Sequence, residues 1–297
     1  MNVFDQLSEI LEKALAGCGE GGKGPGDRGG NTLALADNLE YMRRLRAEGR
    51  DSSIDFIYVD PPFFTGSVRK GDSSEKSYDD KWQDLPQFLE MLAERLVLMR
   101  ELLSDEGLIA VHLDYRTVHY VKLLMDGIFG SERLVNELIW TYKSGGAGSR
   151  SFARKHDTIL LYSKGPDHYF DVPKEKSYNR DGRPYRFKGV EEYEDENGWY
   201  TLVNQKDVIS MNMVGRTSKE RTGYPTQKPL QLLTLLVGSC SKKSALCADF
   251  FCGSGTLPLA AHTLGRRFIA CDCNPAAVET TKKRLLEAGA AFEELKL

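Results

Sequence analysis

Four consecutive residues, Asp60, Pro61, Pro62 and Phe63, combine a carboxylate, two stiff residues and an aromatic ring. They directly follow the mostly apolar run 54–59, which is typical of a strand buried in a parallel sheet. The two prolines end that strand, because each lacks an N–H group and fixes φ. Ligands of open α/β sheets bind beyond the carboxyl ends of the strands, so this position predicts a functional site.

The side chains of this tetrapeptide suit methylation of an exocyclic amine on a nucleobase. The lone pair of such an amine is delocalised into the ring, so the nitrogen is a poor nucleophile. The carboxylate of Asp60 and the carbonyl of Pro61 can accept its two N–H groups and draw the nitrogen towards tetrahedral geometry. Phe63 offers a face on which a base can stack, which is worth roughly 1–3 kcal/mol. A strand-ending turn with a solvated aspartate is the alternative interpretation.

The tetrapeptide resembles the D-P-P-Y/F signature of DNA amino-methyltransferases. A second segment, Asp249–Thr256 (D-F-F-C-G-S-G-T), resembles the loop with which that family holds S-adenosylmethionine. The catalytic signature precedes the cofactor loop, an order that resembles the β class of the family. The similarity extends over most of residues 32–288, and two signatures in this order are far more specific than either alone.

The resemblance implies direct, in-line transfer of a methyl group from S-adenosylmethionine to a base that has left the duplex. No metal and no covalent enzyme intermediate are needed, because the sulfonium methyl group is already activated. The residues implied for catalysis are Asp60, Pro61, Pro62 and Phe63. The residues implied for cofactor binding are Asp37, Asp60, Thr226, Lys228, Asp249, Phe250, Phe251, Cys252, Gly253, Ser254, Gly255, Thr256 and Asp272.

Two of the implied cofactor elements have a structural alternative. Asp37 lies in an A-D-N sequence that is similar to a cofactor-side element of the family, with alanine in place of the usual glycine; an N-cap for a helix at 39–48 fits equally well. The sequence T-Q-K-P resembles the family element that holds the methionine end of the cofactor. Thr226 and Lys228 lie near the start of a helix expected at 229–239 and suit a carboxylate there, while a structural cap is the alternative.

The glycine turn at the second signature also fits a nucleotide-binding dehydrogenase. That fingerprint requires a third glycine three residues after Gly255, where this chain has Pro258, so the pattern disfavours a dehydrogenase. Proline is tolerated in the first turn of the helix that follows. Asp272 ends the next strand roughly twenty residues on, where an acid can accept both ribose hydroxyls.

The resemblance implies an α/β fold: a doubly wound, mostly parallel methyltransferase (Rossmann-like) sheet with a DNA-recognition insertion. The predicted parts are an N-terminal helix and flexible linker (1–31), a catalytic half (32–142), a target-recognition insertion (143–223) and a cofactor-binding half (224–297). Helical spacing further predicts helices at 4–16, 86–103, 115–129 and 275–288, and apolar runs predict strands at 32–35, 107–113, 138–142, 158–162 and 245–250. We expect the first helix to pack on the main domain, with a partner protein as the alternative.

The segment after the tetrapeptide, 65–81, lacks periodicity and is interpreted as a mobile loop beside the site or a plain surface loop. The insertion is basic at its start. Residues 143–188 hold 11 Lys or Arg against 5 Asp or Glu, with aromatic residues interleaved. Such a segment can neutralise phosphates and read guanine edges. DNA contact is the favoured interpretation, and a solvated face is the alternative.

The chain of 297 residues has the length and composition of one large globular domain, and its net charge of −3 gives no global signal for nucleic acid. Six cysteines without a C-x-x-C pair indicate a reduced, cytoplasmic protein. No apolar run approaches a membrane span, and the N-terminus has no signal-peptide core. His112 and His119 are interpreted as structural, because no cluster completes a metal site around them.

Taken with the resemblance, the sequence predicts an S-adenosylmethionine-dependent DNA methyltransferase that acts on N6 of adenine in duplex DNA. Asp60 at the first position of the signature resembles the N6-adenine branch, whereas serine is commoner in the N4-cytosine branch; the signature leaves N4-cytosine open. An RNA or protein-amide methyltransferase and a non-catalytic DNA-binding subunit are the remaining alternatives. A homodimer and a cognate restriction endonuclease are implied as partners by the family alone.

Overall fold

A computed structural model describes residues 3–19, 21, 29–64, 68–69, 78–79, 84–143 and 149–297. Its centre is a nine-stranded sheet with the strand order β11-β6-β7-β5-β2-β12-β13-β1-β14. The strands are β1 (Thr32–Leu35), β2 (Ile54–Val59), β5 (Leu103–Leu113), β6 (Leu134–Thr141), β7 (His156–Ser163), β11 (Val208–Ser210), β12 (Leu246–Asp249), β13 (Arg267–Asp272) and β14 (Glu293–Lys296). Within this sheet, β7 is the strand that pairs antiparallel with both of its neighbours. The predicted mostly parallel sheet is confirmed.

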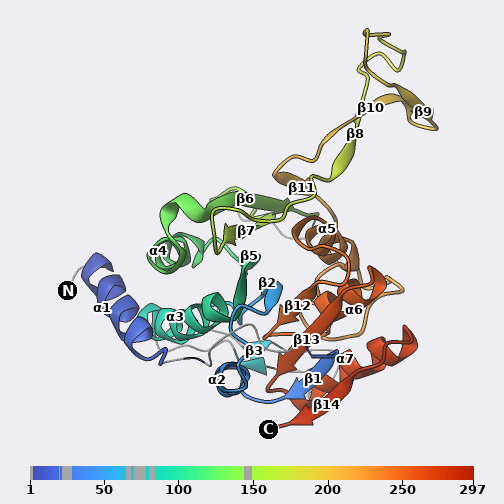
Figure 1. The fold of residues 1–297 in the computed structure, drawn as a ribbon. Helices are drawn as coiled ribbons and strands as arrows, with labels where there is room; N and C mark the ends of the chain where they lie inside the picture. The colour runs from blue at the N-terminus through green and yellow to red at the C-terminus, as the bar shows by residue number, and fades with distance from the viewer. Residues whose placement is uncertain are drawn as a thin grey trace.

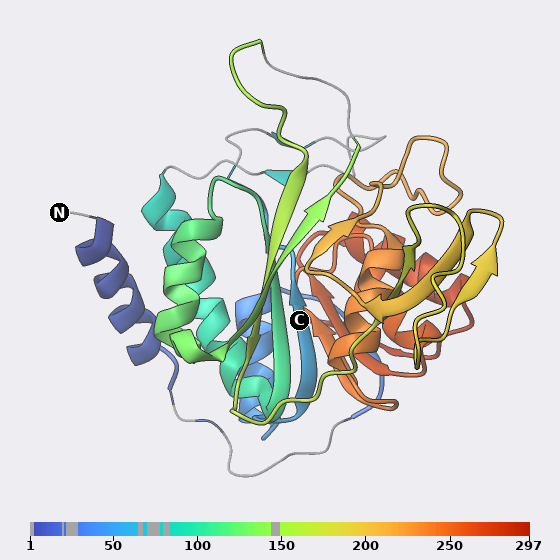
Figure 2. The ribbon, with the colours of Figure 1, turned by 90° about the horizontal axis from the view of Figure 1, so that it is seen from above.

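Helices cover both faces of the sheet (Figures 1 and 2). One face carries α1 (Val3–Ala16), α2 (Asn38–Ala47), α3 (Leu85–Leu102) and α4 (Val118–Phe129), and the other carries α5 (Leu230–Cys240), α6 (Thr256–Thr263) and α7 (Pro275–Glu287). Each face has its own apolar cluster, because successive residues of a strand point to opposite sides. On β2, for example, Phe56 and Tyr58 join the cluster under α5 and α6, while Ile57 and Val59 join the other.

The chain changes direction between β2 and β12. These neighbours come from opposite halves of the sequence, and the chain continues from β2 to β5 on one side and from β12 to β13 on the other. Their register pairs Tyr58 with Asp249. The tetrapeptide that starts at Asp60 and the loop that starts at Phe250 therefore leave the sheet at the same edge. In doubly wound folds, this reversal of strand order opens the crevice in which ligands bind.

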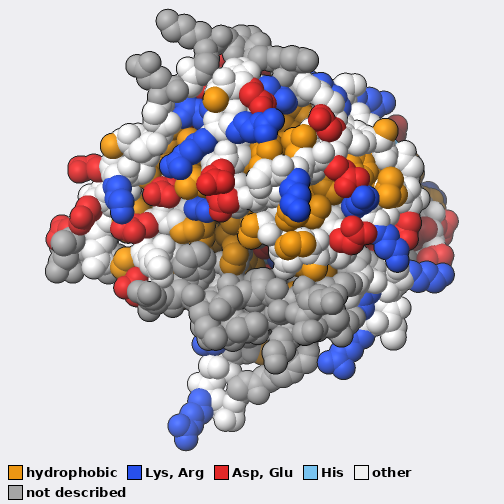
Figure 3. Space-filling model, turned by 90° about the horizontal axis from the view of Figure 1, so that it is seen from below, with side chains coloured by type: hydrophobic (Ala, Val, Ile, Leu, Met, Phe, Trp, Pro, Cys, Tyr) orange, Lys and Arg blue, Asp and Glu red, His pale blue; other side chains and the backbone are white. Residues whose placement is uncertain are grey.

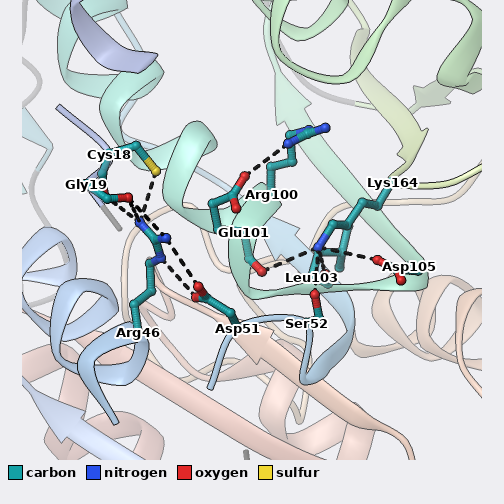
Figure 4. Close-up of polar contacts among 10 residues, drawn as sticks. All are labelled: Cys18, Gly19, Arg46, Asp51, Ser52, Arg100, Glu101, Leu103, Asp105 and Lys164. Carbon is teal, nitrogen blue, oxygen red and sulfur yellow. Dashed lines mark hydrogen bonds and ion pairs between the residues drawn. The ribbon is translucent and has the colours of Figure 1, made fainter. Parts of the chain in front are cut away.

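The amino ends of the strands are held by polar contacts at the opposite edge (Figure 4). Lys164, which follows β7, donates to the carbonyl of Leu103 at 2.6 Å and to the hydroxyl of Ser52 at 3.0 Å. Arg46 of α2 pairs with Asp51 at 2.9 Å. These contacts fix the residues that lead into β2 and thereby the position of its far end.

The N-terminal helix packs on the main domain, as predicted. Leu7, Ile10 and Ala14 of α1 are buried in the same apolar cluster as α3 and α4. Leu11 lies so close to Gly127 that a Cβ atom added there would meet its side chain at 2.4 Å. The predicted linker at 17–31 and the predicted loop at 65–81 fall largely outside the described residues; within the second, β3 (Val68–Arg69) pairs with β4 (Tyr78–Asp79).

The predicted insertion at 143–223 is not wholly separate from the sheet. Two of its strands, β7 and β11, are members of the nine-stranded sheet, because β7 fills the position between β5 and β6. The part that stands off is a three-stranded antiparallel sheet of β8 (Lys174–Tyr178), β10 (Gly198–Asn204) and β9 (Tyr193–Asp195), in that order (Figure 1). The recognition role of this small sheet stays a prediction.

Candidate active site

A cavity of about 350 Å³ lies at the carboxyl edge, where β2, β12 and β13 end. All four predicted catalytic residues line it, and so does every predicted cofactor residue except Gly255. The predicted residues that line the cavity are Asp37, Asp60, Pro61, Pro62, Phe63, Thr226, Lys228, Asp249, Phe250, Phe251, Cys252, Gly253, Ser254, Thr256 and Asp272. The fold thus brings together residues from five stretches of the sequence, around positions 37, 60–63, 226–228, 249–256 and 272.

The carboxylate of Asp60 is engaged by the ammonium group of Lys228, which is buried. The same ammonium nitrogen lies 5.1 Å from the centre of the Phe63 ring, a cation–π distance. The structural cap proposed for Lys228 is not its role here. Glu220 instead accepts a hydrogen bond from the backbone N–H of Leu230 at 3.1 Å in the first turn of α5.

Two further carboxylates end the strands of the cofactor half. Asp249 accepts the backbone N–H of Phe251 at 3.0 Å, and burial raises its pKa well above the ordinary value. Asp272 accepts from the backbone N–H groups of Gly253 and Asn274, both at 2.9 Å, and burial raises its pKa as well. Together with Asp60, they line the cavity with three carboxyl groups, and burial disfavours the ionised form of Asp249 and Asp272.

The glycine loop is held in a conformation that only glycine adopts easily. Gly253 and Gly255 have φ values of 49° and 74°. A Cβ atom on Gly255 would lie 2.5 Å from the side chain of Thr281, which leaves no room for a larger residue at this position. Gly255 does not line the cavity but immediately precedes α6 and directs its start.

Two side chains of the loop pack into the apolar clusters on opposite faces of the sheet. Phe250 is buried in the cluster under α2 and packs edge-on against Tyr41, with ring centres 6.4 Å apart. Cys252 is buried in the other cluster. Burial in apolar surroundings raises the pKa of the Cys252 thiol, so it is an inert packing group.

Asp37 makes the N-cap that was one interpretation of it, and its role towards the cofactor stays a prediction. It is the N-cap of α2, accepting from the backbone N–H groups of Leu39 and Glu40 at 2.9 and 3.2 Å, and it lines the cavity. Arg95 lies 3.6 Å from its carboxylate and donates to Asn38 at 2.6 Å. Arg95 and Asn38 also line the cavity but were missed. Arg95 belongs to no recognisable motif, and Asn38 ends the A-D-N sequence, in which only Asp37 was predicted to face the cofactor.

A second cavity of about 340 Å³ adjoins the first. Four residues line both cavities: Phe63, Thr226, Gln227 and Lys228. The rest of the second cavity is lined by residues in or beside the hairpin β6–β7, among them Trp140, Tyr142 and Asp157, by residues 114–116 after β5 and by Met213. No sequence pattern pointed to this cavity.

A chain of hydrogen bonds runs behind this second cavity. The Nδ1 atom of His112 lies 2.7 Å from the hydroxyl of Tyr58, and its Nε2 atom lies 3.3 Å from Asp157. Tyr142 donates its hydroxyl to the other carboxylate oxygen of Asp157 at 3.0 Å. Burial lowers the pKa of His112, so the ring is neutral. An ionised Asp157 accepts from Nε2–H, which leaves Nδ1 to accept from Tyr58.

His112 therefore has a structural role towards these partners, as predicted. Among the residues that the structure describes, no three His, Cys, Asp or Glu side chains form a group that could hold a metal ion. None of the helices in the described ranges is long and apolar enough to cross a membrane.

The fold and the paired signatures define a methyltransferase, and comparison with known proteins identifies its family. A sequence model of the N6/N4 methyltransferase type, described as DNA methylase, matches residues 54–283, and the chain belongs to this family. It is accordingly a DNA methyltransferase whose substrate is DNA.

Individual relatives agree with this assignment. Type II methyltransferase M.EcaI of Enterobacter cloacae is 30% identical over 315 residues, covering 86% of this chain and 69% of that protein. Among solved structures, the M1.HpyAVI–SAM complex superimposes with a TM-score of 0.58 at 20% identity, covering 86% of this chain and 98% of that one. PvuII DNA methyltransferase (cytosine-N4-specific) gives a TM-score of 0.63 at 14% identity, covering 93% and 99%. The structural likenesses support the fold.

Proposed function

We propose that this DNA methyltransferase transfers a methyl group from S-adenosylmethionine to the exocyclic N6 amine of adenine in duplex DNA. The observation that carries the proposal is the position of Asp60. Its carboxylate lines the first cavity, which is walled in part by the glycine loop, and pairs with Lys228, which also lines the second cavity beside an aromatic hairpin. A methyl donor in the first and an acceptor base in the second would meet beside this carboxylate.

The first cavity fits the cofactor in charge and in shape. Asp60, Asp249 and Asp272 line it, and carboxylates suit a sulfonium cation and the hydroxyls of a ribose. Gly253 lets the backbone approach a ligand closely, because no Cβ is present. Lys228 and Arg95 are cations on its walls that suit the carboxylate of the methionine end. When bound, S-adenosylmethionine supplies an activated methyl group.

The residues of the chain then act on the acceptor amine. Asp60 accepts an N–H of the amine and Pro61 offers its carbonyl to the other, so the nitrogen lone pair is directed at the methyl group. Phe63 supports the base by stacking. Asp60 does not deprotonate a neutral amine. The nitrogen becomes acidic only as the methyl group arrives, and it then releases the proton to solvent or to this carboxylate.

Adenine is favoured over cytosine by the residue at the first position of the signature. Asp60 resembles the N6-adenine branch of the family. A solved structure with a similar fold, at a TM-score of 0.63, is cytosine-N4-specific, so the fold by itself does not select adenine. N4-cytosine methylation would use the same mechanism with a smaller base.

The net charge of −3 gives the protein no overall attraction for the negative DNA backbone. DNA binding therefore requires a local basic surface. The face shown in Figure 3 intersperses Lys and Arg with Asp and Glu and offers no basic field. The basic segment 143–188 is the proposed DNA-contacting region. A homodimer and a cognate restriction endonuclease stay predictions, and light scattering of the purified protein tests the first.

The deciding experiment incubates the purified protein with S-adenosylmethionine and unmethylated bacterial DNA, followed by mass spectrometry of the nucleosides. N6-methyladenine is the expected product. N4-methylcytosine would keep the mechanism and overturn the choice of base. Cofactor binding without any methylated nucleoside would overturn the proposed reaction.

A further inference from the structure

The loop between β6 and β7 leaves the sheet at the same edge as the tetrapeptide. β5 runs parallel to β2 and β7 runs antiparallel to β5, so the start of β7 lies beside the end of β5, where Leu113 pairs with Thr158. The described part of this loop, residues 149–155, extends outwards at the top of the view in Figure 2. The loop therefore stands over the edge at which both cavities lie.

The loop is anchored beside the second cavity at its C-terminal end. The backbone N–H of Tyr142 donates to the carbonyl of Lys155 at 3.0 Å. The guanidinium group of Arg154 stacks on the ring of Tyr115, 4.3 Å from its centre, and both of these residues line the second cavity. These contacts hold the chain two residues after Phe152, so that this side chain is presented from a defined place beside the cavity.

Phe152 is the most exposed large apolar residue in the described parts of the chain. Its exposed fraction is 99%, against 63% for the next, Phe187. A single exposed apolar residue is ordinary on a protein surface. Phe152 differs because its exposure is almost complete, because its loop is anchored beside the reacting edge, and because of the charges around it.

The loop around Phe152 is basic. Residues 149–156 contain Arg150, Arg154 and Lys155 and no Asp or Glu. This local charge is opposite in sign to the net charge of the chain and complements the phosphates of DNA. An exposed apolar ring between arginines has the chemistry of side chains that wedge between DNA bases while cations hold the adjoining phosphates.

We propose that the loop 149–155 acts as a wedge, in which the ring of Phe152 enters the DNA base stack at the position that the target base has left. Arg150 and Arg154 neutralise the phosphates on either side. The inference rests on the proposed function, because a base that leaves the duplex opens a gap in the stack. A ring that fills this gap replaces the lost stacking and thereby stabilises the extruded state.

The test compares binding to two duplexes that differ only at the target. One carries the target found with the wild-type enzyme, and the other has an abasic site in its place, so that its gap needs no extrusion. Fluorescence anisotropy measures both affinities at saturation with a non-reactive cofactor analogue. We expect the wild type to bind the abasic duplex more tightly.

Phe152→Ala should lose this preference for the abasic duplex. Its kcat/KM for the intact target should fall roughly 10- to 100-fold, the effect of removing one stacking aromatic side chain. Phe152→Trp keeps an aromatic face and should retain the preference. Because the side chain is exposed, neither substitution should change Tm measurably.

Two control variants separate the ring from exposed apolar surface in general and from charge. Leu286→Ala removes a 57% exposed apolar side chain from α7 and should leave the preference and kcat/KM at wild-type values. Arg150→Ala should weaken binding of both duplexes equally, reduce the slope of log K against log salt by about one, and keep the preference.

The wedge is overturned, and the proposed function left standing, if Phe152→Ala keeps the wild-type preference for the abasic duplex, whatever its overall affinity. The absence of any such preference in the wild type would overturn it too. An unchanged salt slope in Arg150→Ala would remove the phosphate contact. A wild-type protein that methylates no DNA would overturn both the wedge and the proposed function.

Discussion

The ammonium group of Lys228 donates a hydrogen bond to the carboxylate of Asp60, although the two residues are 168 positions apart in the sequence. The pair engages one of the two carboxylate oxygens, Oδ2, that can accept the amine of the substrate in the proposed reaction. We infer that Lys228 turns away when the amine is accepted through this oxygen. The carboxylate of the methionine end of the cofactor is an alternative partner for Lys228 within the same cavity. This relationship implies that the cofactor prepares the site for DNA.

The first prediction concerns this order of binding. For the wild type, we expect saturation with a non-reactive cofactor analogue to increase the affinity for target DNA, because the analogue draws Lys228 from Asp60. Lys228→Met should bind the analogue at least 10-fold more weakly, since a charge-assisted hydrogen bond is lost. Its affinity for DNA should not change when the analogue is added at saturation. Fluorescence anisotropy with a labelled duplex measures both effects.

Lys228→Arg is the matched control. It retains the positive charge and should keep the dependence of DNA affinity on the analogue, with a smaller loss in analogue affinity. Equal DNA affinity of the wild-type protein with and without the analogue would rule out the preparatory role of the cofactor.

The sequence predicted which residues meet in the first cavity where those residues are consecutive. The runs from Asp60 to Phe63 and from Asp249 to Thr256 are local patterns, and the apolar run before each of them predicted a strand end there. The register between β2 and β12 then brings the two runs together. Strand ends, helix spans and the edge of the sheet follow from short-range rules, so they were predictable.

Contacts between distant segments were not predictable. Asp157 meets His112 because β7 inserts antiparallel between β5 and β6, and pairing of strands across 45 residues leaves no local spacing signal. Arg95 reaches the cavity from the middle of α3, where its position on the helix looks like an ordinary polar position. The structural cap that was the alternative for T-Q-K-P is made by Glu220, which accepts the N–H of Leu230 at the start of α5, because an ammonium group such as that of Lys228 has no acceptor to offer.

The second prediction concerns Asp60 itself. Asp60→Asn keeps the volume but removes the charge that stabilises the developing positive charge on the amine nitrogen. We expect kcat to fall roughly 100-fold or more, by analogy with the loss of one aligned polar group in other active sites. The KM for DNA should change little. Single-turnover methylation of a target duplex measures kcat, and circular dichroism confirms that the variant is folded. Near-normal turnover by a folded variant would remove Asp60 from the mechanism.

The third prediction separates backbone conformation from packing at the glycine loop. Gly255→Ala must adopt a φ of 74° and also place a Cβ atom 2.5 Å from Thr281. Gly265→Ala adopts a similar φ of 70° in open space. The left-handed conformation costs about 1–2 kcal/mol in both variants, and overpacking adds about 1–3 kcal/mol for Gly255→Ala alone. Chemical denaturation should therefore show a larger loss for Gly255→Ala. Equal losses would show that the neighbouring side chain adjusts freely.

The last prediction follows from the buried carboxylate of Asp249, whose pKa burial raises above the ordinary 3.8. A raised pKa means that the folded protein holds the proton more tightly than the unfolded chain, so stability is lost as the pH rises through the folded-state value. Asp249→Asn removes this penalty and keeps an oxygen to accept the N–H of Phe251. We expect the variant, without cofactor, to have a higher Tm than the wild type at pH 7. The difference should shrink as the pH is lowered towards 3.8.

Asp195→Asn is the control of opposite sign, because the Lys176 hydrogen bond lowers the pKa of Asp195, so this variant should gain no stability at pH 7. A lower Tm for Asp249→Asn at pH 7 would mean that the ionised carboxylate stabilises the empty site.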